Sequence, residues 1–275
     1  MGNLFTAAAE CLAEVDPARK QALSAGYADA WLAGRLDMDA REAGPVLDLP
    51  GRPGRPQLVP PRRLARRRLT SIQGRAALIH AVAHIEFNAI NLAWDAVQRF
   101  RDLPRGFYDD WVRVAAEEAM HFGLMRGRLR DLGLDYGSFP AHDGLWEMAR
   151  RTAGDPLVRM ALVPRVLEAR GLDVTPGMIE RLLAVGDTAT ADCLRVILRE
   201  EVGHVAAGTR WFRYLCAQRG LDPEDTFFGL LRTHLTGEVR CPLNLEHRRE
   251  AGFAPGELER LQSLCAGASE AGRDG

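Results

Sequence analysis

Lysine is almost absent from this chain of 275 residues, in which Lys20 is the only lysine among 36 basic residues. Eight of the arginines fall between Leu49 and Ile85, a stretch without any acidic residue. Such a stretch can bind a polyanion, but no aromatic residue alternates with the arginines as a stacking platform for bases would require. We therefore interpret it as an arginine-rich linker with an exposed helix start, and nucleic acid is not an expected partner. The eight are Arg52, Arg55, Arg62, Arg63, Arg66, Arg67, Arg68 and Arg75.

Cysteine pairs of the Cys-x-x-Cys type are also missing. The five cysteines are an odd number at wide spacing, a pattern that predicts reduced thiols and excludes a disulfide framework or a zinc knuckle. A built-in rubredoxin-like electron carrier is excluded as well, so a redox cycle would take its electrons from an external donor. The cysteines are Cys11, Cys193, Cys216, Cys241 and Cys265.

Long apolar runs are missing too. No segment reaches the roughly 20 uninterrupted apolar residues that cross a bilayer, and the N-terminus lacks a basic stretch followed by an apolar one. No run of alternating apolar and polar residues indicates a sheet. With 47% hydrophobic residues, the chain has ample material for a packed core. We expect an all-α, cytoplasmic protein without a membrane partner.

What the chain does contain is a repeated motif, Glu-Glu-x-x-His, which occurs twice within segments of helical periodicity. Residues three apart share one face of a helix. Glu118 and His121 therefore direct an oxygen and a nitrogen toward one point, and Glu201 and His204 do the same. Such a point suits a transition metal.

Two further glutamates extend the motif to a four-helix pattern. Glu86 precedes Glu118 by 32 residues, and Glu168 precedes Glu201 by 33, so the chain reads as two helical hairpins of nearly equal stride. Metal-binding four-helix bundles take one glutamate from each of two helices and a Glu-x-x-His pair from each of the other two. The 50 residues between Glu118 and Glu168 suit a crossover between the hairpins.

The two additional glutamates differ in their surroundings. Glu86 projects from the apolar stripe of its helix, where a charge is expensive unless it is paired or bound to a cation. Glu168 has Arg165 and Arg170 nearby, so an ordinary ion pair is the alternative for it. Its spacing to Glu201 is what favours a metal ligand.

The helical periodicity predicts an ordered series of parts. Bundle helices are expected at about 70–99, 109–133, 156–171 and 188–220, with a kink at Pro164 and a break between N-terminal helices near Asp16-Pro17. The expected parts are an N-terminal helical extension (1–44), a Pro/Arg-rich strap (45–69), a four-helix bundle with a long crossover between its second and third helices (70–220), a C-terminal extension packed on the bundle (221–265) and a disordered tail (266–275).

Polar residues around the ligands have two interpretations each. Ligating histidines usually donate their second N–H to a carboxylate, so Glu117 is predicted to support His204 and Glu200 to support His121; solvated surface acids are the alternative. A polar stripe opposite Glu86 is either a second polar site or, as we favour, a face against which a terminal segment docks through hydrogen bonds. The stripe comprises His80, His84, Asn88, Asn91 and Asp95.

Four carboxylates and two imidazoles form a hard ligand set that suits Fe(II) or Mn(II) better than the thiolate-rich sets of structural zinc. We expect two iron ions, with manganese or a mixed pair as the alternatives. Carboxylates can bridge two metals, which lets an iron pair react with O2. The six predicted ligands are Glu86, Glu118, His121, Glu168, Glu201 and His204.

Seven stretches carry a likeness to a known family: Pro60-Pro61, Gly74-Arg75, His80–Asp95, Glu117–His121, Leu167–Asp173, Glu200–His204 and Pro242–Phe253. Through them the chain resembles the ferritin-like superfamily and, more closely, the uncharacterised bacterial family called domain of unknown function 455. The resemblance covers about residues 45–253. It implies a ferritin-like bundle and the six metal ligands above, but no substrate, because the activity of that family is not established.

The expected function is that of an oxidase or oxygenase that takes O2, a small organic substrate and an external electron donor. Iron storage or handling in the manner of ferritin is an alternative, and it needs a hollow multi-subunit shell. An RNA-modifying hydroxylase is a further alternative, suggested by a resemblance to ferritin-like tRNA hydroxylases and by the arginine segment. A metal-free bundle that mediates contacts is the fourth, and a homodimer is left open.

Overall fold

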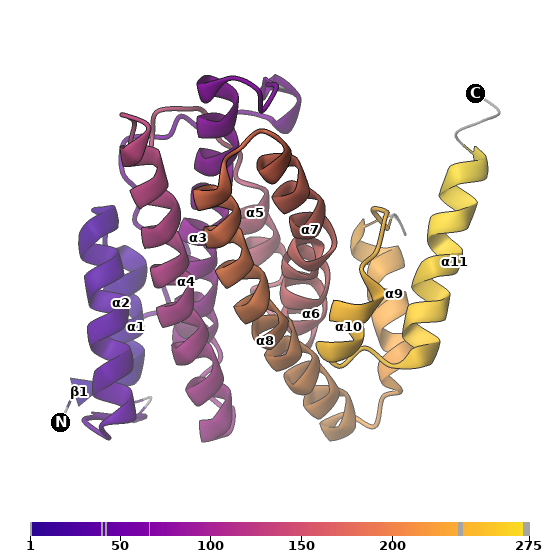
Figure 1. Cartoon of the computed structure of the whole chain (residues 1–275). Helices are drawn as coiled ribbons and strands as arrows, with labels where there is room; N and C mark the ends of the chain where they lie inside the picture. The colour runs from indigo at the N-terminus through magenta and orange to yellow at the C-terminus, as the bar shows by residue number, and fades with distance from the viewer. Residues whose placement is uncertain (1, 40, 42, 66, 236–238, 272–275) are drawn as a thin grey trace. The chain divides into compact units, whose positions relative to one another are not determined.

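Helices make up nearly all of the regular structure in the computed structural model (Figure 1), which confirms the prediction of an all-α chain. The structure describes residues 2–39, 41, 43–65, 67–235 and 239–271, the last six without their side chains. The chain forms two compact units, the first from Met1–Arg150 and Arg181–Cys193, the second from Arg151–Glu180 and Leu194–Gly275. The predicted boundaries of extension, strap, bundle and tail stay predictions.

The N-terminal segment forms two helices, α1 (Leu4–Ala13) and α2 (Pro17–Leu32), with the break that the sequence predicts. Asn3 begins α1 because its side-chain oxygen accepts hydrogen bonds from two backbone N–H groups of the first turn. Asp16 caps α2 in the same way, and Pro17 takes a first-turn position, where its missing N–H is not needed.

Two long helices, α3 (Ile72–Arg99) and α4 (Arg105–Asp131), form the centre of the first unit and pack against each other along their length (Figure 1). α1 packs on α3, and α2 packs on α4. Ser71 starts α3 by accepting a hydrogen bond from the N–H of Gly74 at 3.0 Å. Gly133 follows the end of α4 with a φ of +74°, which glycine adopts without strain.

Helix α3 is also long and apolar enough, by length and composition, to cross a membrane. Yet 78% of its most apolar 18-residue window is buried inside the protein. This burial is the pattern of a core helix that other helices cover.

The segment between α2 and α3 is fastened to the first unit by hydrogen bonds. It includes β2 (Leu36–Asp37), which pairs in parallel with β1 (Gly2–Asn3), and a short 3-10 helix, η1 (Pro61–Arg63). Two-residue strands are too short for any alternation, which explains why the sequence does not predict them. Farther along, the N–H of Val59 donates to the carbonyl of Ala141 at 2.8 Å. The strap is therefore anchored at Val59.

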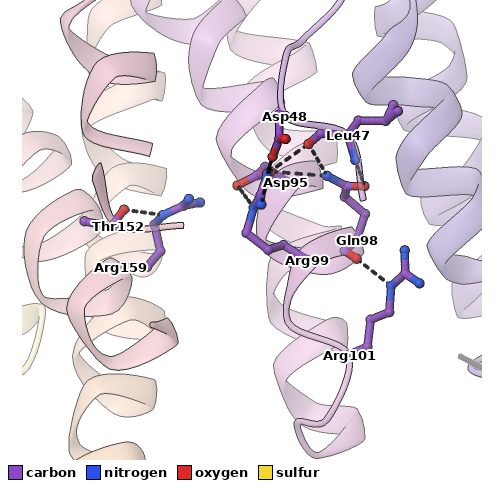
Figure 2. A network of polar contacts seen from close by, with 8 residues as sticks. All are labelled: Leu47, Asp48, Asp95, Gln98, Arg99, Arg101, Thr152 and Arg159. Atoms are coloured by element: carbon purple, nitrogen blue, oxygen red, sulfur yellow. Dashed lines mark hydrogen bonds and ion pairs between the residues drawn. The ribbon is translucent and has the colours of Figure 1, made fainter. Parts of the chain in front are cut away.

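Side chains at the C-terminal end of α3 bind the strap at Leu47, near its start. Gln98 exchanges two hydrogen bonds with the backbone of Leu47, at 3.0 and 2.9 Å. Arg99 donates to both carboxylate oxygens of Asp95 and to the carbonyl of Leu47 (Figure 2). Leu47 belongs to no strand, so the side chains of Gln98 and Arg99 provide hydrogen-bond partners for its backbone N–H and C=O groups.

The remaining helices follow α4 in the chain, and most of their residues belong to the second unit, except most of α5, the end of α7 and the start of α8. They are α5 (Gly144–Arg151), α6 (Pro156–Leu162), a π-helical segment η2 (Val163–Glu168), α7 (Ala169–Ala184), α8 (Thr188–Gln218), α9 (Pro223–Leu235), α10 (Leu245–Glu250) and α11 (Pro255–Ala271).

The kink predicted at Pro164 takes the form of the π-helical segment η2. Proline has no N–H for the helical ladder and its ring pushes the preceding turn aside, and a widened turn absorbs both effects. Gly208 of α8 packs against this turn so closely that a Cβ at that position would lie 2.2 Å from the Pro164 ring. Only glycine fits there.

Arg165, the next residue of η2, is buried in the core of the second unit and forms an ion pair with Glu257 at the start of α11. Its guanidinium carbon lies 4.1–4.6 Å from the centroids of three phenylalanine rings. Burial lowers the pKa of Arg165 to about 10, although Glu257 favours the charged form. The three rings are Phe212, Phe227 and Phe253.

A disulfide bond joins Cys241 and Cys265, so the prediction of five reduced thiols is wrong for these two. Their Cα atoms lie 5.8 Å apart although 24 residues separate them, a proximity that follows from folding and not from sequence spacing. Cys11, Cys193 and Cys216 are free thiols. Helix α11 continues to Ala271, past the predicted start of the tail, and residues 272–275 lie outside the described residues.

Lys20, the only lysine of the chain, is fully buried and joins the N-terminal helices to α3. Its ammonium group donates to the carbonyl of Leu12 at 3.0 Å and to the side-chain oxygen of Asn91, and it lies 5.2 Å from the centroid of the Phe87 ring. Burial lowers the pKa of Lys20 from 10.5 to about 7. Two acceptors and one ring face therefore hold an ammonium group that the interior otherwise disfavours.

The lowered pKa of Lys20 predicts a stability that rises with pH. Between about pH 7 and about pH 10.5 the unfolded chain binds a proton that the folded chain does not, so stability is highest above that window and falls as the pH decreases through it. Relative to Lys20→Met, the free energy of unfolding should increase by up to about 1.4 kcal/mol per pH unit in this window. Urea titrations of both proteins at several pH values measure it.

Arg19→Met is the control for this experiment, because Arg19 precedes Lys20 on the same helix but has a side chain that is 76% exposed. Its difference from the wild type should not vary with pH in the same window. A difference between wild type and Lys20→Met that is flat from about pH 7 to about pH 9 would contradict the lowered pKa.

Candidate metal centre

Glu86 lies in the middle of α3 and is only 3% exposed. Its neighbours on the same face, one turn away on either side, are the buried apolar residues Val82, Ala83, Ala89 and Ile90. Leaving a carboxylate in such surroundings costs several kcal/mol unless a cation or proton compensates it. The burial that the sequence pattern predicts for Glu86 is therefore present.

Helix α4 presents Glu118 and His121 toward Glu86. Both side chains are fully buried. The Nδ1 atom of His121 lies 3.4 Å from Oε2 of Glu118 and 3.5 Å from Oε2 of Glu86. One ligand atom from each of the three residues lies within 4.8 Å of the others. Two carboxylates and one imidazole thus face a common point in the first unit, which could hold a metal ion.

The electrostatics of this group favour a cation. Burial, together with the charge of Glu118, raises the pKa of Glu86 well above its usual value. Burial alone would lower the pKa of His121, but Glu118 and Glu86 outweigh it and raise that pKa to about 11. Without a metal, a proton on the imidazole balances part of the negative charge. A divalent cation would replace that proton and satisfy both carboxylates.

Three aromatic rings enclose the residues next to these ligands. Phe87 follows Glu86, Phe122 follows His121, and their ring centroids lie 5.5 Å apart. The ring of Tyr136 packs on both, at 5.3 and 5.2 Å. This apolar packing joins α3 to α4 beside the charged group.

Tyr136 carries no signal in the sequence pattern, since it lies in the connection after α4. Its hydroxyl lies 2.8 Å from Nδ1 of His84. The other ring nitrogen of His84, Nε2, lies 3.1 Å from the carbonyl oxygen of His142 and 3.1 Å from the side-chain amide nitrogen of Asn88. Burial lowers the pKa of His84 to about 4, which keeps this imidazole neutral.

The rest of the predicted polar stripe also has partners in the first unit. His80 accepts a hydrogen bond from the N–H of Gly137 at 2.9 Å, and Asn91 accepts one from Lys20. Asp95 is held by Arg99 and Gln98 (Figure 2). Asp95 thus pairs within its own helix, whereas Asn91 and His80 have partners from α2 and from the connection after α4. The two interpretations of the stripe stay predictions.

The second Glu-x-x-His pair lies on α8 in the second unit. His204 is fully buried and Glu201 is 8% exposed, and Nδ1 of His204 lies 3.7 Å from Oε2 of Glu201. The half-buried Glu168 is the last residue of η2. Each unit therefore contributes a glutamate and a Glu-x-x-His pair, and the assignment of all six residues as ligands of one centre stays a prediction.

The two arginines near Glu168 have other partners. Arg165 pairs with Glu257. Arg170 lies 3.6 Å from Asp173 and donates to backbone carbonyls of the segment before α10. Both arginines thus contact residues other than Glu168, and the ion-pair alternative for Glu168 stays a prediction.

The acids that precede the two ligand pairs are only partly exposed. The side chain of Glu117 is 27% exposed and accepts hydrogen bonds from Arg113, one turn earlier on α4. The side chain of Glu200 is 24% exposed and lies 3.2 Å from Arg199. Neither is a fully solvated surface acid, and their support of His204 and His121 stays a prediction.

Comparisons with known proteins identify the family of the chain. A family model described as "Protein of unknown function (DUF455)" matches residues 13–259. The chain belongs to this family. A relative from Haemophilus influenzae, called "Uncharacterized protein", is 45% identical over 233 residues, which cover 82% of this chain and 81% of the relative. No solved structure matches. Membership of DUF455 thus fixes the family and assigns no reaction.

Burial of the two carboxylates predicts that Glu86→Gln stabilises the metal-free protein. The substitution puts a neutral amide of the same shape where the interior and Glu118 disfavour a charge, so the free energy of unfolding should increase by about 1–2 kcal/mol. A carboxyl with a raised pKa loses its stabilising proton as the pH rises, so the gain should be larger near pH 8 than near pH 5. Urea unfolding in the presence of a chelator measures both.

Glu117→Gln is the matched control, because it is the same change of side chain at a partly exposed position of the neighbouring helix α4. Its effect should stay within about 0.5 kcal/mol. If Glu86→Gln lowered the free energy of unfolding of the metal-free protein at both pH values, the idea that the buried carboxyl of Glu86 destabilises it would be wrong.

Proposed function

We propose that this DUF455 member is a dinuclear metal–carboxylate protein that uses O2 to oxidise a small organic substrate. In the proposal, Glu86, Glu118 and His121 of the first unit and Glu168, Glu201 and His204 of the second hold two iron ions between them, with manganese as the alternative. The observation that carries the proposal is the buried group formed by Glu86, Glu118 and His121.

The donor set fits two dications. Four carboxylates balance four positive charges, and oxygen with imidazole nitrogen is the ligand chemistry that iron and manganese accept in proteins. The second unit repeats the Glu-x-x-His pair with a similar internal distance, 3.7 Å against 3.4 Å. Such a repeat is what a two-metal centre with a pseudo-symmetric ligand set requires.

The metal pair would supply the reaction with O2, and the protein residues would control its surroundings. Phe87, Phe122 and Tyr136 pack on one another beside the first ligand group, where they would exclude water and strengthen the electrostatic interactions inside it. The imidazole of His121 and the carboxyl of Glu86 can hold a proton that a cation displaces, because both have raised pKa values.

Electrons would come from outside the chain. Among the described cysteines, the free thiol of Cys11 is buried and its pKa is raised to about 12. Burial also raises the pKa of Cys193 and Cys216. Because the thiolate is the reactive form, the raised pKa values disfavour these residues as an internal donor. The predicted external electron donor, a ferritin-like relationship, a homodimer and a cytoplasmic location remain parts of this proposal.

Metal content tests the proposal. Protein purified from cells grown with iron should carry about two metal ions per chain by elemental analysis. Glu118→Ala and Glu201→Ala should each reduce the content to below about one, since each removes a ligand from one Glu-x-x-His pair. Glu259→Ala, at an exposed position of α11, is the control and should retain the wild-type content. Equal metal content in all four proteins would contradict the proposed ligands.

Oligomeric state distinguishes an enzyme from a storage protein. Sedimentation velocity of the metal-loaded protein should give a monomer or a homodimer. A particle of many subunits would favour iron storage instead, because storage in the manner of ferritin needs a hollow shell.

A further inference from the structure

A cavity lies on the outer side of α3, between the arginine-rich strap and the connection after α4. Its volume is about 200 Å³. It belongs entirely to the first unit, and none of the six predicted metal ligands lines it. An apolar cavity of about 150 Å³ is large enough for benzene, so this one accommodates a ligand with a ring or a short chain.

The floor of the cavity is apolar. Ala77, Ala81 and Ile85 of α3 line it at intervals of four residues, so they form one stripe along the helix. Phe139 and Leu145 line it from the connection and from α5. Ile85 is 47% exposed, although most of α3 is buried. This apolar surface gains free energy when a ligand covers it.

The rim of the cavity is positively charged. Arg63 and Arg67 line it from the strap. The guanidinium of Arg67 lies 5.1 Å from the centroid of the Phe139 ring and donates to the side-chain oxygen of Gln73 at 3.2 Å. Within the described part of the chain, neither arginine forms an ion pair with a carboxylate. No acidic residue occurs between Leu49 and Ile85, so nothing nearby in the sequence neutralises them.

The walls of the cavity are held in place before any ligand binds. Val59 donates to the carbonyl of Ala141, and Ala141 donates to the carbonyl of Gln57, at 2.8 and 3.0 Å. His84 lines the cavity, is 6% exposed, and is fixed by Tyr136 and the carbonyl of His142. Pre-formed walls reduce the entropy that binding would otherwise lose.

We propose that this cavity binds a small organic anion, a carboxylate or phosphate monoester with an apolar body of roughly ten non-hydrogen atoms. The apolar body lies on the floor formed by Ala81, Ile85 and Phe139, and the anionic group pairs with Arg63 and Arg67. A guanidinium binds a carboxylate or phosphate through two parallel hydrogen bonds. The proposal does not depend on the metal centre.

A small ligand explains the cavity better than a nucleic-acid strand does. The structure supplies one aromatic ring beside the arginines, Phe139, which the sequence alone does not reveal. A strand would need a series of such rings along an open groove. A cavity with one ring, an apolar floor and two arginines on its rim instead suits one ligand with one charged end.

Calorimetric titration of the full-length protein tests the proposal. The probes are hexanoate and phenyl phosphate, with inorganic phosphate as the probe that has charge alone and 1-hexanol as the probe that has an apolar chain alone. Both organic anions should bind, at least tenfold more tightly than either control compound. Arg67→Gln and Arg63→Gln should each weaken binding by about tenfold, and Ala81→Leu, which fills the floor, should abolish it.

Arg62→Gln is the matched control, because Arg62 is an exposed neighbour in the same strap that does not line the cavity. It should bind both anions as the wild type does. All four variants change exposed positions, and circular dichroism with thermal unfolding verifies that each is folded. Three results would overturn the proposal: an equal loss in Arg62→Gln, binding of inorganic phosphate as tight as that of phenyl phosphate, or binding of single-stranded RNA without binding of either organic anion.

Discussion

Two carboxylates that face each other in a dry interior repel one another, and the organisation of the first unit follows from containing that repulsion. Glu86 and Glu118 come from different helices, so the repulsion acts directly against the packing of α3 on α4. His121 lies between them and lowers it, with Nδ1 within 3.5 Å of both. Burying the remaining charge still costs free energy of folding. Packing elsewhere between α3 and α4 must supply that free energy.

The packing that meets this cost is mainly aromatic. Phe87 and Phe122 take their places from Glu86 and His121, the predicted ligands that they directly follow. Tyr136 then covers both rings from the connection after α4. A tyrosine in this place needs a partner for its hydroxyl, and His84 supplies one from the outer face of α3. The inner and outer faces of α3 are thus coupled through a single side chain.

Buried polar groups on the two faces of α3 differ in their protonation and charge. On the outer face, His84 and His80 have hydrogen-bond partners, and burial lowers the pKa of each to about 4, so both remain neutral. On the inner face, Glu86 and His121 have raised pKa values and together hold charge and proton. Neutral groups with full hydrogen bonds fix a structure. A buried charged group that favours a cation is better explained as a binding site for that cation.

Sequence periodicity was sufficient for most helices, because their limits are set by local chemistry. The break at Asp16-Pro17 and the end of α4 before Gly133 depend on a cap, a proline and a glycine. The burial of Glu86 follows from a local pattern as well. Tyr136, Phe139 and the disulfide bond between Cys241 and Cys265 depend on contacts between distant segments. No local pattern encodes such contacts, and for this reason the sequence did not reveal them.

The π-helical segment η2, which ends at Glu168, shows what the local sequence does not predict. A proline in a helix predicts a disturbance but not its geometry, which here depends on what packs around it. Gly208 allows α8 to approach the Pro164 ring, and three aromatic rings with Glu257 fix Arg165. A widened turn is less favourable than an α-helical one, so it persists only where surrounding contacts hold it. Those contacts determine the direction in which the helix leaves the turn, and therefore the position of Glu168 at its end. A π-helical turn of the second unit thus ends at a predicted metal ligand, as expected where the position of a side chain matters more than the regularity of its helix.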